Sequence, residues 1–365
     1  MAQPESINLN LINYMKLNRL FLKNFRNYTE QAFSFAPSVN YIFGDNAQGK
    51  TNLLEAIYLL ITGRSFCTPH LQDLVRFGEE SFYIEGHFTK NGVDQVLKMH
   101  YAHEKRKIFY NATPLTSLSS LFGILQGVIL TPEDHLLLTG NPKLRRHFLD
   151  LGIAQTNPLY LHHLNRYQKA MKQRNALLRA KKLETVEIWE EQMAASAHYL
   201  MEERSKCVKE LAQALEEFPF DPLELTYLPS CPNDLSGQLA RNRTRDMLLG
   251  STSFGPHRDD LSILLRKKQA RYFASEGQKR STIAALKFAE WKRVQKVANE
   301  PPLLCIDDLG VSFDEKREKQ LLQFLQHFGQ VFVTHTKINS SLIPEACLLQ
   351  IEDGNGYNNI AQILS

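Results

Sequence analysis

One eight-residue stretch constrains the fold of this chain more than any other. Residues 44–51 read Gly-Asp-Asn-Ala-Gln-Gly-Lys-Thr and match G-x-x-x-x-G-K-[ST], the pattern of a phosphate-binding loop, or P-loop. A short apolar run at 39–43 predicts a buried strand before the loop, and apolar residues at 53, 54, 57 and 60 predict one face of a helix after it. Strand, loop and helix follow in the order that a P-loop requires. The alternative is a glycine-containing turn with an exposed lysine.

The residues of this loop suit phosphate chemistry. Gly44 and Gly49 allow positive φ angles, so that backbone N–H groups and the helix N-terminus can point at phosphate oxygens. Lys50 adds a cation for the β- and γ-phosphates, and Thr51 adds the hydroxyl that P-loop proteins use to hold Mg²⁺. ATP and Mg²⁺ are the predicted cofactors. The ATP-binding residues predicted in this loop are Gly44, Asp45, Asn46, Ala47, Gln48, Gly49, Lys50 and Thr51.

A second half of the site is predicted near the C-terminus. Residues 303–308 read Leu-Leu-Cys-Ile-Asp-Asp, which predicts a buried parallel strand with two carboxylates at its C-terminal edge, where open α/β sheets bind their ligands. Asp307 is predicted to hold Mg²⁺ together with Thr51, and Asp308 to orient and deprotonate the attacking water. A capping aspartate is the alternative. His335 ends another buried strand and is predicted to sense the γ-phosphate, a structural histidine being the alternative.

A third element is the loop Ser275, Glu276, Gly277 and Gln278, which precedes a helical stretch. Ser275 can cap this helix and Gly277 lets the backbone approach an anion, so the loop is a second phosphate-binding end, with Ser275, Gly277 and Gln278 as its ATP-binding residues. One nucleotide does not need two such ends in one chain. The loop is therefore predicted to complete the nucleotide site of a second copy. Residues 235–238, Leu-Ser-Gly-Gln, have a similar sequence and are predicted to form a turn.

The composition leaves the choice of partner open. Lys and Arg number 43 against 39 for Asp and Glu, so a DNA-binding surface would have to come from local clustering. The five cysteines contain no C-x-x-C spacing, which favours a reduced compartment. No apolar run approaches the roughly 18 residues that span a bilayer. The chain is therefore expected to be cytoplasmic, without a membrane partner.

The pattern of apolar residues changes along the chain. Alternation at 16–35 predicts two paired strands, and alternation at 82–101 predicts a half-solvated antiparallel sheet. From about 141 to 218 the pattern is helical. This segment contains no acid between positions 160 and 182. Two interpretations of its cations remain open, a solvated helix face and a surface that binds DNA phosphates. These cations are Arg166, Lys169, Lys172, Arg174, Arg179, Lys181 and Lys182.

Taken together, these features resemble an ABC-type ATPase head of the SMC kind. Several blocks are similar to the RecF family of bacterial recombination mediators, and the resemblance runs from about residue 16 to the C-terminus. Two blocks are specific, because a generic ABC head has no reason to carry both: Arg-Arg-His-Phe-Leu-Asp at 145–150 and Gly-Pro-His-Arg-Asp-Asp at 255–260. The other matching blocks are 22–28, 44–51, 131–134 and 275–278.

The resemblance implies an α/β fold, an ABC-type P-loop ATPase head with a mixed sheet and an inserted helical lobe. Residues 1–130 would form the N-terminal part of the ATPase lobe, 131–250 the helical insertion, and 251–365 the C-terminal part. It further implies an ATP-dependent homodimer, binding to gapped or single-stranded DNA without sequence preference, and weak ATP hydrolysis. Loading of recombinase with RecR- and RecO-like partners and a role in the SOS response are also implied.

The chain departs from the family pattern at three places. Glu276 stands in the signature loop where a neutral residue is usual, Phe313 stands in the predicted subunit-bridging loop at 312–314, and the acidic strand ends Asp-Asp rather than Asp-Glu. A shorter acid at 308 is consistent with slow turnover. The alternatives are a transport ATPase subunit, which would bind a membrane partner rather than DNA, and an adaptor that binds ATP without hydrolysing it.

Overall fold

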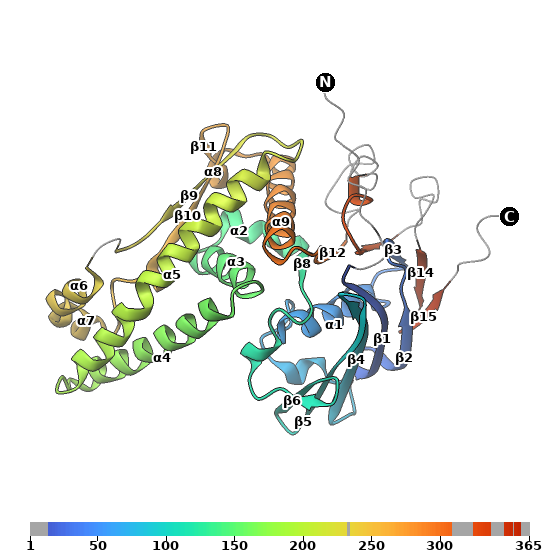
Figure 1. Cartoon of the computed structure of the whole chain (residues 1–365), viewed down its shortest axis with the longest axis horizontal. Helices are drawn as coiled ribbons and strands as arrows, with labels where there is room; N and C mark the ends of the chain where they lie inside the picture. Colours follow the sequence, from blue (N-terminus) through green and yellow to red (C-terminus); the bar gives the residue numbers. More distant parts are fainter. Residues whose placement is uncertain (1–13, 232–233, 309–323, 337–346, 353, 359–365) are drawn as a thin grey trace. The chain divides into compact units, whose positions relative to one another are not determined.

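The computed structural model describes residues 14–231, 234–308, 324–336, 347–352 and 354–358. Contacts divide the chain into two compact units, which are described one at a time. The first unit comprises Met1–Pro132 and Val294–Ser365, and the second comprises Glu133–Arg293. Figure 1 gives the labels of the helices and strands. Among the described residues, no helix combines the length and the apolar character that crossing a membrane would need.

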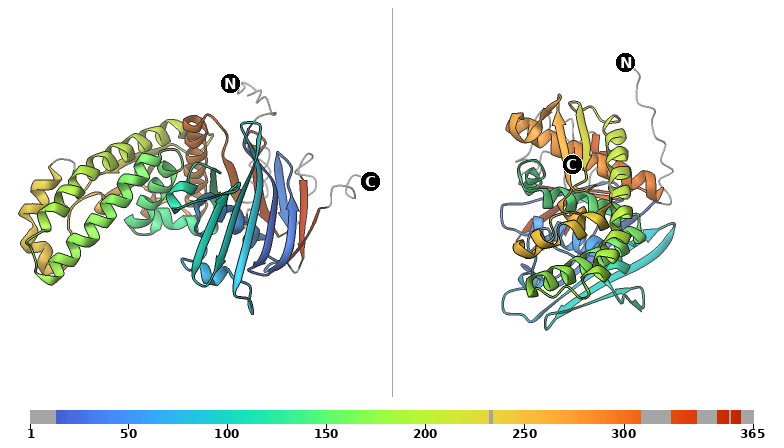
Figure 2. Two further views of the ribbon diagram at one scale, coloured as in Figure 1. Left: turned by 60° about the horizontal axis from the view of Figure 1, so that its bottom comes forward. Right: turned by 90° about the vertical axis from the view of Figure 1, so that its left-hand side faces the viewer.

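The first unit contains an antiparallel sheet with the strand order β2-β1-β4-β5-β6-β7. Figure 2 (left) shows its blue to blue-green strands side by side. Leu20, Leu22, Ile84 and Met99 are fully buried while their sequence neighbours are more exposed, which confirms the predicted half-solvated sheet. The strands are β1 (Lys16–Phe25), β2 (Tyr28–Ser34), β4 (Ser81–Lys90), β5 (Val93–Ala102), β6 (Lys105–Tyr110) and β7 (Thr113–Pro114).

A second sheet of the same unit is mixed and has the order β15-β14-β3-β13-β12-β8. Only β15 runs antiparallel to its neighbour among the described strands of this sheet. Because β13 lies between β3 and β12, the carboxyl ends of these three parallel strands meet at one edge. The strands are β3 (Val39–Phe43), β8 (Gly127–Leu130), β12 (Leu303–Ile306), β13 (Val331–His335), β14 (Cys347–Glu352) and β15 (Asn355–Asn358).

The long helix of the P-loop follows β3 directly. This helix, α1 (Lys50–Thr62), is buried along most of its length and ends at Gly63, which adopts a left-handed conformation as the C-cap. Two short 3-10 helices complete the described helices of residues 14–132, η1 (Leu71–Leu74) and η2 (Leu118–Leu121).

The second unit is built mainly from helices. Asn141 and Asn157 cap α3 and α4 through their side chains, and proline follows each cap at the first helical position. The paired helices α4 and α5 can be followed in Figure 1. The helices are η3 (Pro132–His135), α2 (Leu136–Thr139), α3 (Pro142–Ala154), α4 (Pro158–Ala180), α5 (Val186–Leu215), α6 (Leu235–Arg241), α7 (Arg243–Leu249), η4 (Pro256–Arg258), α8 (Ala270–Phe273) and α9 (Glu276–Ala298).

A small antiparallel sheet completes this unit, with the order β11-β10-β9. Its strands are β9 (Leu223–Leu228), β10 (Asp260–Leu265) and β11 (Lys268–Gln269). Because β10 pairs along its whole length with β9, residues 251–293 group with the helical unit by contact rather than with the C-terminal segment. The prediction that 251–365 form the C-terminal part of the ATPase lobe stays a prediction.

The structure corrects the interpretation of residues 235–238. They do not form a turn but begin the helix α6. Asp234 caps this helix, because its carboxylate accepts a hydrogen bond from Gly237 N at 2.9 Å. The Ser-Gly-Gln sequence therefore serves a short capped helix, away from the loop at 275–278.

Candidate functional site

The P-loop adopts the backbone conformation that its glycines allow. Gly44 has a φ of 151° and Gly49 a φ of 117°, and Ala47 between them is also left-handed at 66°. A Cβ on Gly44 would lie only 2.3 Å from the carbonyl oxygen of Ile351. Both glycines are thus required by φ and by space, which confirms the prediction of positive φ.

Lys50 begins α1 and is only 8 % exposed. Its Nζ donates hydrogen bonds to the carbonyl oxygens of Gly44, at 2.7 Å, and Asp45, at 2.6 Å. Burial lowers the pKa of Lys50, and the carboxylates of Asp308, Asp307 and Asp45 oppose this shift. The ammonium group of Lys50 is therefore fixed against the backbone of the loop, with carboxylates nearby.

The acidic strand meets the P-loop helix as predicted. Asp307 follows β12, and both of its carboxylate oxygens accept from the hydroxyl of Thr51, at 3.0 and 3.1 Å. Thr334 of β13 donates its hydroxyl to Asp307 Oδ1 at 2.8 Å and accepts from Asp308 N at 2.7 Å. Thr334 was not identified from the sequence. It orients the Asp307 carboxylate and holds the backbone of Asp308.

Asp308 has a φ of 53°, a left-handed conformation that is uncommon outside glycine. Such a conformation requires support from the surroundings, and the Thr334 hydroxyl supplies it. Its carboxylate is the charge that most strongly opposes the lowered pKa of Lys50. Asp308 therefore lies at the P-loop edge of the sheet.

His335 ends β13, between the P-loop strand and the acidic strand. It pairs in register with Phe43, the last residue before Gly44. Its ring is 9 % exposed and stacks on Tyr41 with the ring centroids 5.9 Å apart. The predicted site residues of the first unit thus converge at one sheet edge.

A brace behind the P-loop could not be identified from the sequence alone. Asn27 Nδ2 donates to the carbonyl oxygen of Gln48 at 2.8 Å, and the fully buried Tyr28 donates its hydroxyl to the carbonyl oxygen of Gly49 at 2.9 Å. Asn52 donates to Asn27 Oδ1, also at 2.8 Å. In a trans peptide the C=O and the following N–H point in opposite directions. Holding these two carbonyls outward therefore directs the next two N–H groups to the other side of the loop.

The predicted signature loop lies in the second unit, at the N-terminus of α9. Gln278 N donates to Ser275 Oγ at 3.3 Å, and Ser275 N donates to Gln278 Oε1 at 2.9 Å. This reciprocal pair is a capping box, so the predicted cap is confirmed. Glu276 is exposed and pairs with Lys279 at 2.7 Å. The hydrogen bond and charge of Lys279 lower the pKa of Glu276.

The two specific sequence blocks are joined by ion pairs in the second unit. Arg145 donates to both carboxylate oxygens of Asp260, at 2.6 and 3.0 Å. Arg204, from α5, lies 2.8 Å from Asp150 and 3.1 Å from Asp259, and both Arg204 and Asp259 are almost fully buried. The Arg145–Asp260 pair and Arg204 thus connect the two blocks within this unit.

The basic run of α4 does not form a single surface. Arg174 is fully buried, and it donates to Glu190 at 3.0 Å and to Asp246 at 2.7 Å, so its reading as a surface cation is wrong. Arg166, Lys169 and Lys172 are exposed. The helical repeat explains the difference, because position 174 falls on the face that packs against α5.

Two predictions are not tested by the structure. The bridging loop at 312–314 lies outside the described residues. Within the parts of the chain that the structure describes, no cluster of three or more Asp, Glu, His and Cys side chains could hold a metal ion. The hydroxyl of Thr51 and the carboxylate of Asp307, which are the predicted oxygen ligands of Mg²⁺, lie beside the P-loop.

Comparisons with known proteins agree with this geometry. Residues 16–346 match the family model of the RecF/RecN/SMC N terminal domain. The DNA replication and repair protein RecF of Protochlamydia amoebophila (strain UWE25) is 46 % identical over 338 residues, covering 88 % of this chain and 94 % of the relative. A solved structure of the recombination mediator protein RecF-ATP in the RecFOR pathway is 32 % identical, with a TM-score of 0.89, and covers 96 % of this chain and 99 % of its own.

A more distant structure shows the fold alone. The SMC head bound to the C-winged helix domain of ScpA is 14 % identical, with a TM-score of 0.53, covering 94 % of this chain and 97 % of its own. The predicted ABC-type ATPase head, with a mixed sheet and a helical insertion, is thus confirmed. The chain belongs to the RecF family.

Proposed function

We propose that this chain is an ATP-dependent DNA-binding protein of recombinational DNA repair and replication restart. It binds ATP with Mg²⁺, dimerises on ATP, hydrolyses ATP weakly, and helps to load recombinase at single-strand gaps in the cytoplasm. RecR- and RecO-like proteins are its partners, and it contributes to SOS induction. The relative's name, DNA replication and repair protein, and the RecF-ATP structure of the RecFOR pathway support this proposal.

The pairing of Thr51 with Asp307 is the observation that carries it. A hydroxyl and a carboxylate from segments 256 residues apart meet at 3.0 Å beside the P-loop. Mg²⁺ prefers oxygen ligands and usually takes one or two protein carboxylates, completing its shell with water and substrate phosphates. Thr51 and Asp307 would hold the ion, and the P-loop N–H groups and Lys50 would bind the phosphates.

The other residues of the sheet edge have separate roles in this proposal. When bound, MgATP supplies the phosphoryl group that water attacks. Asp308 orients that water and accepts its proton, for which its constrained backbone is suited. His335 donates a hydrogen bond to the γ-phosphate from its place beside the P-loop strand. Asn27 and Tyr28 hold the loop in the conformation that receives the phosphates.

Dimerisation follows from the two phosphate-binding ends. In this proposal Ser275, Gly277 and Gln278 contact the γ-phosphate held by the P-loop of a second copy. The capping box uses the N–H groups of Ser275 and Gln278, so the backbone N–H groups of Glu276 and Gly277 are the ones that the N-terminus of α9 offers to an anion. The γ-phosphate thereby links two chains, and its hydrolysis weakens the link. ATP acts mainly as a switch of oligomeric state.

DNA is bound through its phosphates on the exposed cations of α4. Lys169 and Lys172 are the central residues of this surface, and the buried Arg174 takes no part. Phosphate contacts carry little sequence information, which matches a protein that acts at gaps of any sequence. Each lost duplex-phosphate contact would flatten the log–log salt dependence of DNA affinity by about 0.9.

Sedimentation velocity tests the proposal. The full chain is measured with and without ATP and with and without gapped DNA, at two salt concentrations. An ATP-dependent dimer that takes up DNA in a salt-sensitive way is the expected result. Lys50→Ala should remain monomeric with ATP, because it removes the phosphate cation. A wild-type chain that stays monomeric under every condition would refute the proposed switch.

A further inference from the structure

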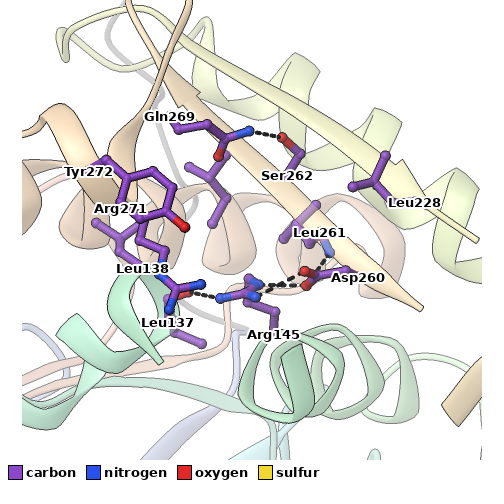
Figure 3. Close-up of a pocket in the computed structure, with 11 residues that line it drawn as sticks. Leu137, Leu138, Arg145, Leu228, Asp260, Leu261, Ser262, Gln269, Arg271 and Tyr272 are labelled. Atoms are coloured by element: carbon purple, nitrogen blue, oxygen red, sulfur yellow. Dashed lines mark hydrogen bonds and ion pairs between the residues drawn. The ribbon is translucent and has the colours of Figure 1, made fainter. Parts of the chain in front are cut away.

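A pocket of about 310 Å³ lies in the second unit, and its lining includes none of the residues assigned to the P-loop site. Figure 3 shows the Arg145–Asp260 pair at one end, Ser262 and Gln269 at the other, and Arg271 with Tyr272 along one side. Pockets for small ligands begin at roughly 300 Å³. This pocket therefore has room for a planar ring system.

Beside the pocket, two large aromatic side chains are exposed to solvent, and each has a cation near the face of its ring. Tyr272 is 71 % exposed and Phe273 is 67 % exposed, although both are large and apolar. The guanidinium of Arg271 lies 5.4 Å from the ring centroid of Tyr272, and the ammonium of Lys268 lies 5.7 Å from that of Phe273. We call these four residues the aromatic–basic platform.

The segment that carries the platform is rich in cations. Residues 266–274 read Arg-Lys-Lys-Gln-Ala-Arg-Tyr-Phe-Ala and contain no acid. Within the described part of the chain, neither Lys268 nor Arg271 forms an ion pair. Asp260, the acid of the pocket, is neutralised by Arg145, because both of its oxygens accept from the guanidinium. The platform therefore presents uncompensated positive charge together with ring faces.

The polar end of the pocket offers a donor and an acceptor. Gln269 Nε2 donates to Ser262 Oγ at 3.1 Å, which fixes both side chains. The proton of the Ser262 hydroxyl and Gln269 Oε1 are left for a ligand. A neighbouring donor and acceptor match the edge of a nucleobase, which presents the same two kinds of group.

We propose that the aromatic–basic platform and its pocket bind single-stranded nucleic acid through unstacked bases. One base stacks on Tyr272 and enters the pocket, where Ser262 and Gln269 contact its edge. The next base stacks on Phe273, and Lys268 and Arg271 neutralise the adjoining phosphates. Aromatic rings that alternate with cations are the usual means of holding single strands without sequence preference. This inference rests on the proposed DNA binding and adds to it a site for the single-stranded part of a gap.

A single-stranded oligonucleotide carrying a central 2-aminopurine tests the site on the full-length chain. Base stacking on an aromatic ring should quench its fluorescence, and anisotropy gives the affinity. Tyr272→Ala and Phe273→Ala should each weaken single-strand binding about 5-fold or more and reduce the quenching. Tyr272→Phe should retain both, because it keeps the ring. Affinity for a blunt duplex should not change, because its bases are already stacked.

Phe77→Ala is the matched control, since Phe77 is a fully exposed aromatic of the other unit and should have no effect. Unchanged affinity and quenching in Tyr272→Ala would overturn the inference. So would loss of ATP-dependent dimerisation in that variant with normal single-strand binding, which would assign the platform to a second copy of the chain. A wild-type chain that binds duplex but not single strands refutes this site alone. A chain that binds neither refutes the proposed DNA binding as well.

Discussion

Replacing Arg174 tests whether the basic run of α4 is divided between core and surface. Arg174 is fully buried and donates to Glu190, Asp246, Thr252 and the carbonyl oxygen of Leu239. Arg174→Met keeps much of the apolar volume but leaves the buried carboxylate of Asp246 without its cation. Loss of one partner from a buried pair costs about 3–5 kcal/mol.

The helical unit can be observed on its own by fluorescence. The chain has two tryptophans, Trp189 and Trp291, and both lie within Glu133–Arg293. Urea unfolding followed at these tryptophans should show the free energy of unfolding of this unit reduced by about 3–5 kcal/mol in Arg174→Met. For a unit of this size the melting temperature should fall by roughly 6–20 °C, at about 2–4 °C per kcal/mol.

Lys172→Met is the control, because it also replaces a cation by methionine, at an exposed position of the same helix. Its free energy of unfolding should stay within about 0.5 kcal/mol of the wild type, while its DNA affinity should become less sensitive to salt. Arg174→Met should thus lower stability without changing DNA binding, whereas Lys172→Met should change DNA binding without lowering stability. A loss below about 1 kcal/mol in Arg174→Met would refute the reasoning on buried charge.

Three further variants test the site and its surroundings. Asp308→Asn should bind ATP and persist as a dimer while phosphate release slows about 100-fold or more, and rapid release would remove Asp308 as the base. Tyr28→Phe removes the hydrogen bond to Gly49, so ATP affinity measured by calorimetry should fall about 2–10-fold; an unchanged affinity would refute the brace.

The third concerns His257, whose pKa is lowered to about 4 because of burial. Between about pH 4 and pH 6.5 the unfolded chain, in which the histidine pKa is near 6.5, binds more protons than the folded chain. The contribution of neutral His257 to the free energy of unfolding is therefore complete above about pH 6.5 and is lost as the pH falls toward 4. Stability of the helical unit should drop by about 2 kcal/mol from pH 7.5 to pH 5, and His257→Gln should lose this part of the pH dependence.

Local patterns in the sequence predicted much of the site. The P-loop, the acidic strand and the strand that ends at His335 each lie within one short segment whose spacing encodes its conformation. Parallel strands place their carboxyl ends at one edge, so the meeting of Thr51 with Asp307 followed from the order of the elements. The cap at Ser275 was equally local, since donor and acceptor are three residues apart.

The tertiary structure decided what depends on contacts between distant segments. The burial of Arg174, the support of Asp308 by Thr334, and the hold of Asn27 on the P-loop each join residues that are more than twenty positions apart. A run of cations looks the same in a sequence whether its members face solvent or a carboxylate. By itself the sequence determined which groups the chain could bring to the site; only packing selected the partner of each group, because burial and pairing depend on neighbours that the local pattern does not record.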